Sequence, residues 1–416
     1  MKTVIAPAFS GGRIKAIASK SAAHRLLICA AFAKGDTRIL CEEINEDIQA
    51  TARCLTALGA DIKREAPYFY VSPVKEVNRG AVLDCGESGS TQRFLVPVTC
   101  MLGADASFLM SGRLPDRPLS PLREELERCG VSFSPVGSNP LVCKGRLRET
   151  EFSIRGDVSS QFISGLLFAL AVSAKAGRIC VIGELQSAPY VDITADALRI
   201  FGIDVSVTAE GYEIKENSGL VSPRDVVVEG DWSNAAFPLA LGAIGNEAVT
   251  VHGLDIASRQ GDKAVLEVLE SMGAQTEIEN DSVTVYPSKL RGVSIDASQI
   301  PDLVPILASV AAVADGETVI YNAQRLRIKE SDRLYAVREV LNTLGAKVEE
   351  TDDGLRIVGS PTLAGGEISS FGDHRIVMSA AIVSARCEKA VIINGAEAVS
   401  KSYPSFFEDM KRLGLK

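Results

Sequence analysis

The sequence has few of the residues that mark a metalloprotein or a disulfide-stabilised protein. Its three histidines, at positions 24, 252 and 374, show no HExxH motif and no zinc-ligand spacing, so a structural metal is not expected. The nine cysteines contain no CxxC pair, and their number is odd. This pattern favours reduced thiols in the cytoplasm over a disulfide framework.

The chain also lacks an excess of positive charge, a nucleotide fingerprint and a long apolar run. A net charge of −9 argues against a general nucleic-acid binder, although it leaves room for a local basic site that takes a phosphate-bearing small molecule. Neither GxxxxGK[ST] nor GxGxxG occurs, so we expect no nucleotide and no cofactor. The apolar helices are too short to cross a bilayer and have charged flanks, so we expect no membrane span, and no signal peptide before the strand-like run 3–8.

The most informative feature that is present is a repeat. Six times a short polar loop runs directly into an apolar helix, and the interval between loops is almost constant. The loops are centred near Lys20, Ser90, Ser160, Asp231, Asp302 and Asp373. Such a fixed interval indicates one supersecondary unit used repeatedly. Because a helix N-terminus offers free N–H groups and about half a positive charge, these loops are the expected anion-binding positions.

The helices that follow these loops are apolar on all sides, which predicts that they are buried. Their expected ranges are 22–33, 91–101, 161–174, 234–244, 303–314 and 376–385. A second set, including 119–129, 262–272 and 332–344, mixes an apolar stripe with charges and is expected nearer to solvent. Each unit then reaches a glycine that is expected to form a left-handed helix cap before a strand, namely Gly59, Gly130, Gly202, Gly273, Gly345 and Gly414.

The repeats predict an α/β protein of six βαβαββ units, three in each of two domains. The expected domains are 19–226 and 1–18 plus 227–416. The last unit lacks trailing strands, so the N-terminal run 3–8 is expected to complete it, whereas 13–18 is expected to open the first unit. We expect a ligand cleft between the domains, with the chain crossings near Ser19 and Glu229 acting as a hinge that closes on binding.

Loops in the first half of the chain contain groups suited to anions. Lys20, Ser21 and Arg25 are predicted to converge on one anion, and the alternative is a capping serine with solvated bases. Gly89 allows a ligand to approach the backbone, although a tight turn explains it equally well. The run Ser159-Ser160-Gln161 can bind a phosphate or sugar hydroxyls, whereas capping explains only one of its three polar groups.

Loops in the second half add carboxylates. Asp302 stands at the head of an apolar helix, either as an N-cap or as a general base near a substrate hydroxyl. The charged stretch 325–333 could be a solvated face, but it occupies the same place in its unit as loops that contain Arg117, Tyr190 and Lys401. The residues therefore predict an acid and a base among cations, which suits proton transfer on polyanionic substrates.

Four motifs at the expected separations carry a resemblance to the 5-enolpyruvylshikimate-3-phosphate synthase group of the enolpyruvyl transferase family. They are Ser19-Lys20-Ser21…Arg25, Val158-Ser159-Ser160-Gln161, Leu326–Arg333 and Gly372-Asp373-His374-Arg375. The resemblance covers essentially the whole chain. It implies an inside-out α/β barrel, with helices inside and sheets outside. It also implies transfer of the enolpyruvyl group of phosphoenolpyruvate to the 5-hydroxyl of shikimate 3-phosphate, on the route to chorismate and the aromatic amino acids.

The resemblance also implies roles for particular residues. Asp302 would take the hydroxyl proton, Glu330 would protonate C3 of phosphoenolpyruvate, and Lys20 would touch both substrates. Shikimate 3-phosphate would be held by Lys20, Ser21, Arg25, Ser159, Ser160, Gln161, Ser187, Tyr190, Asp302, Arg325 and Lys329. Phosphoenolpyruvate would be held by Lys20, Gly89, Arg117, Gln161, Arg333, Arg375 and Lys401. Arg325 stands where some members carry Asn. Because Gly89 is kept, glyphosate is expected to compete with phosphoenolpyruvate.

Two other functions remain open at this point. One is the sister reaction on UDP-N-acetylglucosamine, but the loop 110–116 lacks the cysteine that this sister enzyme carries before its arginine. The other is a non-catalytic polyanion-binding protein, against which the presence of both Asp302 and Glu330 counts. The expected partners are the two small substrates alone, with no nucleic acid and no membrane, and the expected state is a monomer in the cytoplasm.

Overall fold

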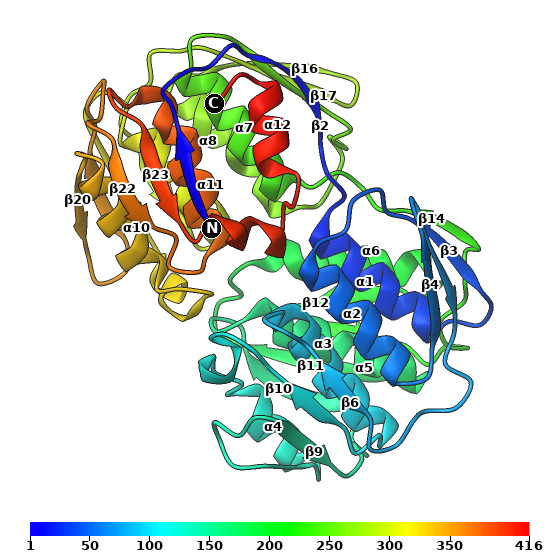
Figure 1. Cartoon of the computed structure of the whole chain (residues 1–416). Helices are drawn as coiled ribbons and strands as arrows, with labels where there is room; N and C mark the ends of the chain where they lie inside the picture. The colour runs from blue at the N-terminus through cyan, green and yellow to red at the C-terminus, as the bar shows by residue number, and fades with distance from the viewer. Residues whose placement is uncertain (416) are drawn as a thin grey trace. The chain divides into compact units, whose positions relative to one another are not determined.

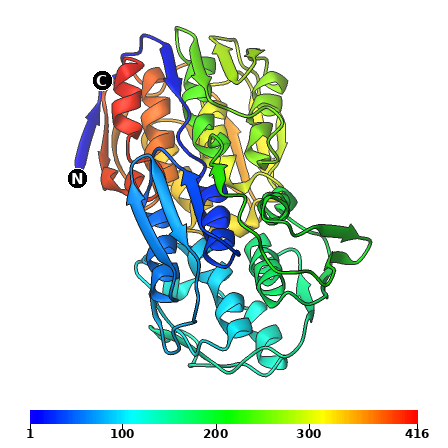
Figure 2. The same cartoon turned by 90° about the vertical axis from the view of Figure 1, so that its right-hand side faces the viewer.

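The computed structural model describes residues 1–415 as a mixed α/β protein (Figures 1 and 2). The chain divides into two compact units. Unit 1 takes Met1–Ile17 and the chain from Glu229 onward, and unit 2 takes Ala18–Val228. Unit 2 is therefore continuous in sequence, whereas unit 1 is assembled from both ends of the chain.

The described part of unit 2 contains three four-stranded sheets, with strand orders β14-β3-β5-β4, β6-β7-β9-β8 and β10-β11-β13-β12. In each sheet the first two strands run parallel and the other neighbours antiparallel. The strands are β3 (Thr37–Leu40), β4 (Asp61–Glu65), β5 (Tyr68–Ser72), β6 (Val82–Asp84), β7 (Ser107–Leu109), β8 (Ser132–Phe133), β9 (Leu141–Lys144), β10 (Glu151–Arg155), β11 (Gly177–Ile182), β12 (Val205–Thr208), β13 (Gly211–Ile214) and β14 (Asp225–Val227).

Three helices of unit 2 form its core: α1 (Lys20–Ala31), α3 (Gly89–Leu102) and α5 (Ser160–Ser173). Almost every residue of each helix is buried, because side chains that are apolar on all sides are stabilised by leaving water. α3 packs on α5, and α1 packs on α2 and α6. The more polar helices are α2 (Glu46–Ala57), α4 (Leu122–Arg128) and α6 (Ala188–Ile200), with a 3-10 turn η1 (Leu114–Asp116).

Unit 1 repeats this plan with two four-stranded sheets, β16-β17-β15-β2 and β18-β19-β21-β20, and one three-stranded sheet, β1-β23-β22, within the described residues. Its strands are β1 (Lys2–Ile5), β2 (Gly12–Lys15), β15 (Val249–His252), β16 (Gln275–Glu279), β17 (Ser282–Tyr286), β18 (Ser294–Asp296), β19 (Glu317–Tyr321), β20 (Lys347–Glu350), β21 (Leu355–Val358), β22 (Gly366–Ser369) and β23 (Val391–Asn394).

The buried helices of unit 1 are α7 (Trp232–Ile244), α9 (Val304–Ala311) and α11 (His374–Val383). They pack on one another, and α10 (Arg333–Thr343) packs on α9 and α11. The remaining elements are α8 (Val265–Ser271), α12 (Phe406–Arg412) and the 3-10 turns η2 (Gly261–Ala264), η3 (Pro301–Leu303), η4 (Gln324–Ile328), η5 (Ser384–Arg386) and η6 (Ala396–Lys401). No helix of the described chain is long and apolar enough to cross a membrane.

The helix ends follow the sequence closely. Side chains at the predicted loops cap five of the six buried helices, with Ser19, Ser88, Ser159, Asp231 and Asp373 accepting from backbone N–H groups in the first turn. The six glycines that were predicted to end the second set of helices all have φ between 84° and 116°. Only glycine adopts this region without strain, so the left-handed caps are confirmed.

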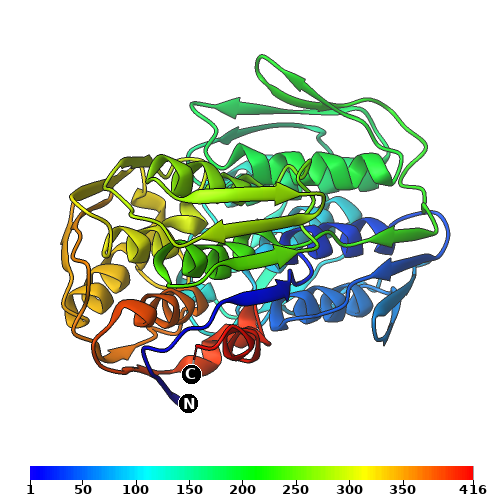
Figure 3. The same cartoon turned by 90° about the horizontal axis from the view of Figure 1, so that it is seen from above.

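One of the first two strands is paired as expected and the other is not. β1 lies antiparallel to β23, so the N-terminal strand does complete the last unit (Figure 1). The run 13–18, however, does not open the first unit, because β2 pairs in parallel with β15 in the fourth (Figure 3). Ile14 is buried in the core of unit 1, which fixes β2 there. The first unit is opened instead by β14, which pairs with β3.

Candidate active site

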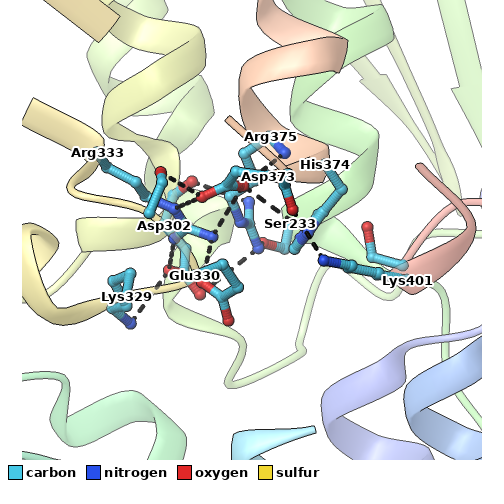
Figure 4. A network of polar contacts seen from close by, with 12 residues as sticks. Ser233, Asp302, Lys329, Glu330, Arg333, Asp373, His374, Arg375 and Lys401 are labelled. Atoms are coloured by element: carbon cyan, nitrogen blue, oxygen red, sulfur yellow. Dashed lines mark hydrogen bonds and ion pairs between the residues drawn. The ribbon is translucent and has the colours of Figure 1, made fainter. Parts of the chain in front are cut away.

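Unit 1 gathers charged side chains where three helices begin (Figure 4). Asp302 lies in the turn η3 just before α9, Glu330 lies between η4 and α10, and Arg333 is the first residue of α10. Asp373 is the N-cap of α11. Because α9, α10 and α11 pack together, their N-terminal ends bring residues that are far apart in sequence into one polar cluster.

The guanidinium of Arg333 is the centre of this cluster. Nε donates to Asp373 Oδ2 at 2.8 Å, Nη1 to Asp302 Oδ1 at 2.8 Å and Nη2 to Glu330 Oε2 at 2.7 Å. Only 2% of the Arg333 side chain is exposed. Burial alone lowers the pKa of an arginine, but the three carboxylates more than compensate and hold the pKa of Arg333 above its usual value. Arg333 therefore stays charged and fixes two partly exposed carboxylates, Asp302 and Glu330, relative to each other.

Two further cations flank Asp302. Lys329 Nζ lies 3.3 Å from Oδ1, and Arg375 Nη2 lies 3.5 Å from Oδ2. Arg375 also donates from Nη1 to the backbone oxygen of Asp302 at 2.8 Å and from Nη2 to Ser233 Oγ on α7 at 2.7 Å. Three cationic groups therefore lie within 3.5 Å of the Asp302 carboxylate.

Several groups in and behind the cluster have shifted pKa values. Burial lowers the pKa of Lys329 to about 8, against the opposing effect of Asp302. Burial disfavours the charged form of Asp373, yet Arg333 holds the pKa of this carboxyl below its usual value. Burial, together with the charge of Asp302, raises the pKa of Asp262 to about 6. Groups that titrate near neutral pH beside fixed charges are typical of sites that move protons.

The interpretation of Asp302 as a helix cap is wrong. Its turn begins after Ile300, and neither η3 nor α9 has a side-chain cap. The carboxylate turns instead toward Arg333, Lys329 and Arg375, because these charges bind it more strongly than a neutral N–H group would. Asp373 does cap its helix, with Oδ1 accepting from Arg375 N at 2.9 Å.

Lys401 and Arg325 each donate a hydrogen bond to a backbone oxygen. Lys401, the last residue of η6, donates from Nζ to the Gly372 backbone oxygen at 2.8 Å, which places it at the loop before α11 (Figure 4). Arg325 donates from Nη2 to the Ser298 backbone oxygen at 3.0 Å, in the loop before η3. Both therefore lie at loops that lead into the buried helices.

In unit 2 the side chains of the loop around Lys20 bond to residues of neighbouring helices. Lys20 opens α1, and its Nζ donates to Asp47 Oδ2 on α2 at 2.9 Å. Arg25, one turn later, is 2% exposed and donates from Nη1 to the Ser21 backbone oxygen and from Nη2 to the Tyr190 backbone oxygen, each at 2.7 Å. Arg25 thus ties together two residues that were predicted to share one ligand.

The environment of Arg25 differs from that of Arg333. Its Nε donates to Thr194 Oγ1 at 2.7 Å, and its guanidinium lies over the ring of Phe94, 4.9 Å from the ring centre. No carboxylate is among these contacts. Burial therefore lowers the pKa of Arg25 to about 10, although it remains charged at neutral pH.

A second cluster of unit 2 surrounds the start of α3. The Arg117 guanidinium lies so close to Gly89 that a Cβ atom there would be 2.8 Å from Nη1. Arg93 donates from Nη1 to Gln161 Oε1 at 2.8 Å, and Gln161 donates from Nε2 to Ser90 Oγ at 2.9 Å. The structure thus brings Gly89 to Arg117 and Gln161 to the same loop.

The serines of the third repeat have defined places. Ser159 caps α5, its Oγ accepting from Gln161 N at 3.3 Å, and Ser160 is the first residue of that helix. Ser187 precedes α6 with φ of 57°, a left-handed conformation that costs energy for a residue other than glycine.

Four contributors to these clusters were missed by sequence reasoning: Arg93, Asp47, Thr194 and Ser233. Arg93 had a signal, since it is the one charge in the otherwise uncharged stretch 91–101. The others are short polar residues within helices, and only the packing of the helices shows what they face.

Two observations concern other binding possibilities. No group of three or more His, Cys, Asp or Glu side chains suited to a metal ion occurs among the described residues. A cavity of about 620 Å³ in unit 1 contains none of the predicted site residues and is lined by segments that include Gly245, Lys289, Arg291, Asp315 and Arg386. The cavity lies where α7 and α9 end, and helix C-termini carry partial negative charge. The basic side chains that line the cavity therefore balance the charge of these helix ends.

Clustered cations with carboxylates held by one buried arginine, in a mixed α/β fold, are typical of enzymes that bind small anions and move protons. The chain belongs to the EPSP synthase (3-phosphoshikimate 1-carboxyvinyltransferase) family, whose model matches residues 7–410.

Individual relatives agree with this family membership. The chain is 43% identical to a 3-phosphoshikimate 1-carboxyvinyltransferase of Clostridium perfringens, covering 99% of this chain and 98% of the relative. It is 40% identical to that of Clostridioides difficile, covering 99% and 97%. A solved EPSP synthase of Acinetobacter baumannii superimposes with a TM-score of 0.81 at 26% identity, covering 100% of this chain and 98% of that one. The enolpyruvyl transferase NikO of Streptomyces tendae, at 19% identity, a TM-score of 0.77 and coverage of 100% and 97%, shares the fold.

Proposed function

We propose that this chain transfers the enolpyruvyl group of phosphoenolpyruvate to the 5-hydroxyl of shikimate 3-phosphate, releasing phosphate, in the route to chorismate and the aromatic amino acids. The observation that carries the assignment of roles is the shared hydrogen bonding of Asp302 and Glu330 to the buried Arg333. This arrangement holds an acid and a base at fixed separation among cations, as addition to a polyanionic alkene requires.

In the proposed mechanism the 5-hydroxyl oxygen adds to C2 of phosphoenolpyruvate while C3 gains a proton. Asp302 takes the hydroxyl proton as general base, and Glu330 supplies the proton to C3. Loss of a proton from C3 and of phosphate from C2 then restores the double bond. The position of Asp302, partly exposed and held by three cationic neighbours, supports the role of base.

Cations of both units are assigned to the two anions. Phosphoenolpyruvate is assigned to Lys20, Gly89, Arg117, Gln161, Arg333, Arg375 and Lys401. Shikimate 3-phosphate is assigned to Lys20, Ser21, Arg25, Ser159, Ser160, Gln161, Ser187, Tyr190, Asp302, Arg325 and Lys329. The closeness of Gly89 to Arg117 and the link from Gln161 to Ser90 support a common binding loop for phosphoenolpyruvate.

Arg25 has a second role in this proposal. Its donors already reach Ser21 and Tyr190, so it orients these two residues for the ligand as well as contributing charge. Lys20, Arg117, Arg333 and Arg375 stabilise the charge of the tetrahedral intermediate and of the leaving phosphate.

The finer architecture belongs to the same proposal. We assign each unit to one half of an inside-out α/β barrel, made of three βαβαββ repeats with buried helices and outer sheets. Unit 2 is assigned as the side that holds the shikimate phosphate, and unit 1 as the side that supplies the catalytic carboxylates, with residues of both units assigned to phosphoenolpyruvate. The protein is proposed to act as a monomer in the cytoplasm. Light scattering after gel filtration tests the oligomeric state.

The function is tested by measuring phosphate release from purified protein with phosphoenolpyruvate and shikimate 3-phosphate. Release is expected with that pair and not when UDP-N-acetylglucosamine replaces shikimate 3-phosphate. Release with the sugar nucleotide would assign the sister reaction instead. Binding of both anions by calorimetry without any release would assign a non-catalytic protein.

A further inference from the structure

A buried histidine outside the assigned site joins three helices of unit 2. His24 lies on α1, one turn after Lys20, and its Nδ1 is 2.7 Å from Thr51 Oγ1 on α2. Lys20 itself is bonded to Asp47, which lies one turn before Thr51 on α2. Residues four apart share one face of a helix, so two neighbouring side-chain pairs connect α1 and α2. The pair Lys20–Asp47 is partly exposed, and the pair His24–Thr51 lies in the core.

The hydrogen bonding of the buried pair His24–Thr51 continues to α3. Thr51 Oγ1 lies 2.6 Å from Thr91 Oγ1, and Thr91 donates to Ser88 Oγ at 2.8 Å. Ser88 is the N-cap of α3, and its Oγ also accepts from Thr91 N at 3.3 Å. The chain of hydrogen bonds therefore ends at the residue that directly precedes Gly89.

The donors and acceptors in this series of hydrogen bonds can be assigned in only one way. Thr91 has one hydroxyl proton, which goes to Ser88, so Thr51 must donate to Thr91. Thr51 then has no proton left for the imidazole, so His24 must donate from Nδ1. A chain with a single polarity requires the histidine in its Nδ1–H tautomer.

The surroundings of His24 fit the neutral form. The ring is 1% exposed and packs edge-on against Phe94, with ring centres 6.4 Å apart. Its Nε2 has no hydrogen-bond partner within residues 1–415. Burial, with the nearby charges of Lys20 and Arg25, holds the pKa of His24 well below its usual value. A neutral ring can keep Nε2 as an unprotonated nitrogen in this apolar place, whereas a cation would bury an unpaired charge.

We propose that His24, as the Nδ1–H tautomer, is a positioning residue that holds the N-terminal turns of α1 and α3 at a fixed separation through Thr51, Thr91 and Ser88. The consequence is that Lys20 and the backbone at Gly89, both assigned to phosphoenolpyruvate, are placed by one buried hydrogen-bond chain. This inference rests on the proposed function, because the role of the two ends in binding phosphoenolpyruvate comes from there.

The test replaces the middle of the chain at nearly constant volume. Thr51→Val removes both hydrogen bonds of Thr51 and is expected to raise KM for phosphoenolpyruvate at least about fivefold, with a smaller effect on KM for shikimate 3-phosphate. Thr51→Ser keeps the hydroxyl and is expected to restore the wild-type KM. The matched control is Thr99→Val, because Thr99 is also buried on α3 but donates only to Val96 within its own helix.

The outcomes separate this inference from the proposed function. A wild-type protein that releases no phosphate would overturn the function. An active wild type whose Thr51→Val variant keeps KM for phosphoenolpyruvate within twofold would overturn only the positioning role, as would an equal rise for Thr99→Val.

A second measurement observes the tautomer in the wild-type protein and needs a variant only to assign the signal. Long-range ¹H–¹⁵N spectra of the wild type contain three imidazoles, and His24→Gln identifies the one that belongs to His24. The expected signal is the Nδ1–H tautomer without titration between pH 6 and 8. An Nε2–H tautomer, or a titration in that range, would overturn the inference.

Discussion

Each unit buries an arginine near the start of a helix, and the two arginines have opposite surroundings. Arg333 in unit 1 donates to three carboxylates, whereas Arg25 in unit 2 donates to two backbone oxygens and a hydroxyl. In the first arrangement the charge of the arginine is balanced by carboxylates, two of which are partly exposed and assigned to proton transfer. The second leaves the positive charge uncompensated and therefore suited to an anion. Proton chemistry is thus expected to depend on unit 1, whereas anion binding is expected to draw on cations of both units.

The largest effect is expected from the carboxylates of unit 1. Asp302→Asn and Glu330→Gln should each lower kcat by at least about 10²-fold, because each removes a proton-transfer group. The matched control is Glu339→Gln on α10, where the carboxylate is partly exposed and pairs with Arg338. Steady-state phosphate release measures all three. Near-wild-type kcat in both site variants would assign the proton transfers elsewhere.

The next effect concerns stability and compares the two arginines directly. Arg333→Met leaves the fully buried carboxylate of Asp373 without its partner, which should lower the free energy of unfolding by about 3–5 kcal/mol. Arg25→Met removes a charge whose partners are neutral, so we expect about 1–3 kcal/mol. Urea denaturation followed by circular dichroism measures both. Equal losses would show that the carboxylates around Arg333 do not distinguish the two sites.

A smaller effect is expected at the anion-binding loop of unit 2. Gly89→Ala places a Cβ atom 2.8 Å from Arg117 Nη1, so the guanidinium must leave its position. We expect KM for phosphoenolpyruvate to rise on the order of tenfold, which corresponds to the cost of forcing a side chain away from its rotamer. The thermal transition should not change, since the φ of Gly89 is not in the left-handed region. An unchanged KM would show that Arg117 does not bind phosphoenolpyruvate from this position.

The smallest effect is a pH dependence in unit 1. The pKa of Lys329 is lowered to about 8, so the cation is complete below pH 7 and is lost as pH rises through 8. KM for shikimate 3-phosphate should therefore rise by about fivefold between pH 7.5 and 9. Lys329→Arg keeps its charge over this range and should abolish the rise. A rise that persists in this variant would assign the titration to another group.

Much of the fold follows from the sequence because the repeated units begin and end their helices with residues that have strong local conformational preferences. The six capping glycines fix helix ends by backbone geometry and the capping serines by local side-chain hydrogen bonds, so both could be predicted without any tertiary information. The pairing of β2 with β15 could not, because both candidate partners offer the same short alternating pattern. Pairing between strands so distant in sequence is decided by which core buries Ile14.

The site shows the same division. Asp302 stands out at the head of an apolar helix, Glu330 and Arg333 belong to the charged stretch 325–333, and the three do come together. Whether Asp302 caps a helix or faces cations depends on a 3-10 turn that the local sequence does not determine. Asp47 and Thr194 sit in helices where polar residues are ordinary, so only helix packing shows that they hold Lys20 and Arg25.

The first repeat is opened by β14, and β2 pairs in the fourth repeat. This arrangement affects the order in which the chain can fold during synthesis. The segment Ala18–Val228 contains every strand of its own three sheets, including β14, so this half can be completed as soon as it has emerged from the ribosome. The segment Met1–Ile17 emerges earlier but finds its partners, β15 and β23, only after these much later strands have been made. Within the newborn N-terminal segment, β2 must therefore remain unpaired until β15 has been made, and β1 until β23 has been made.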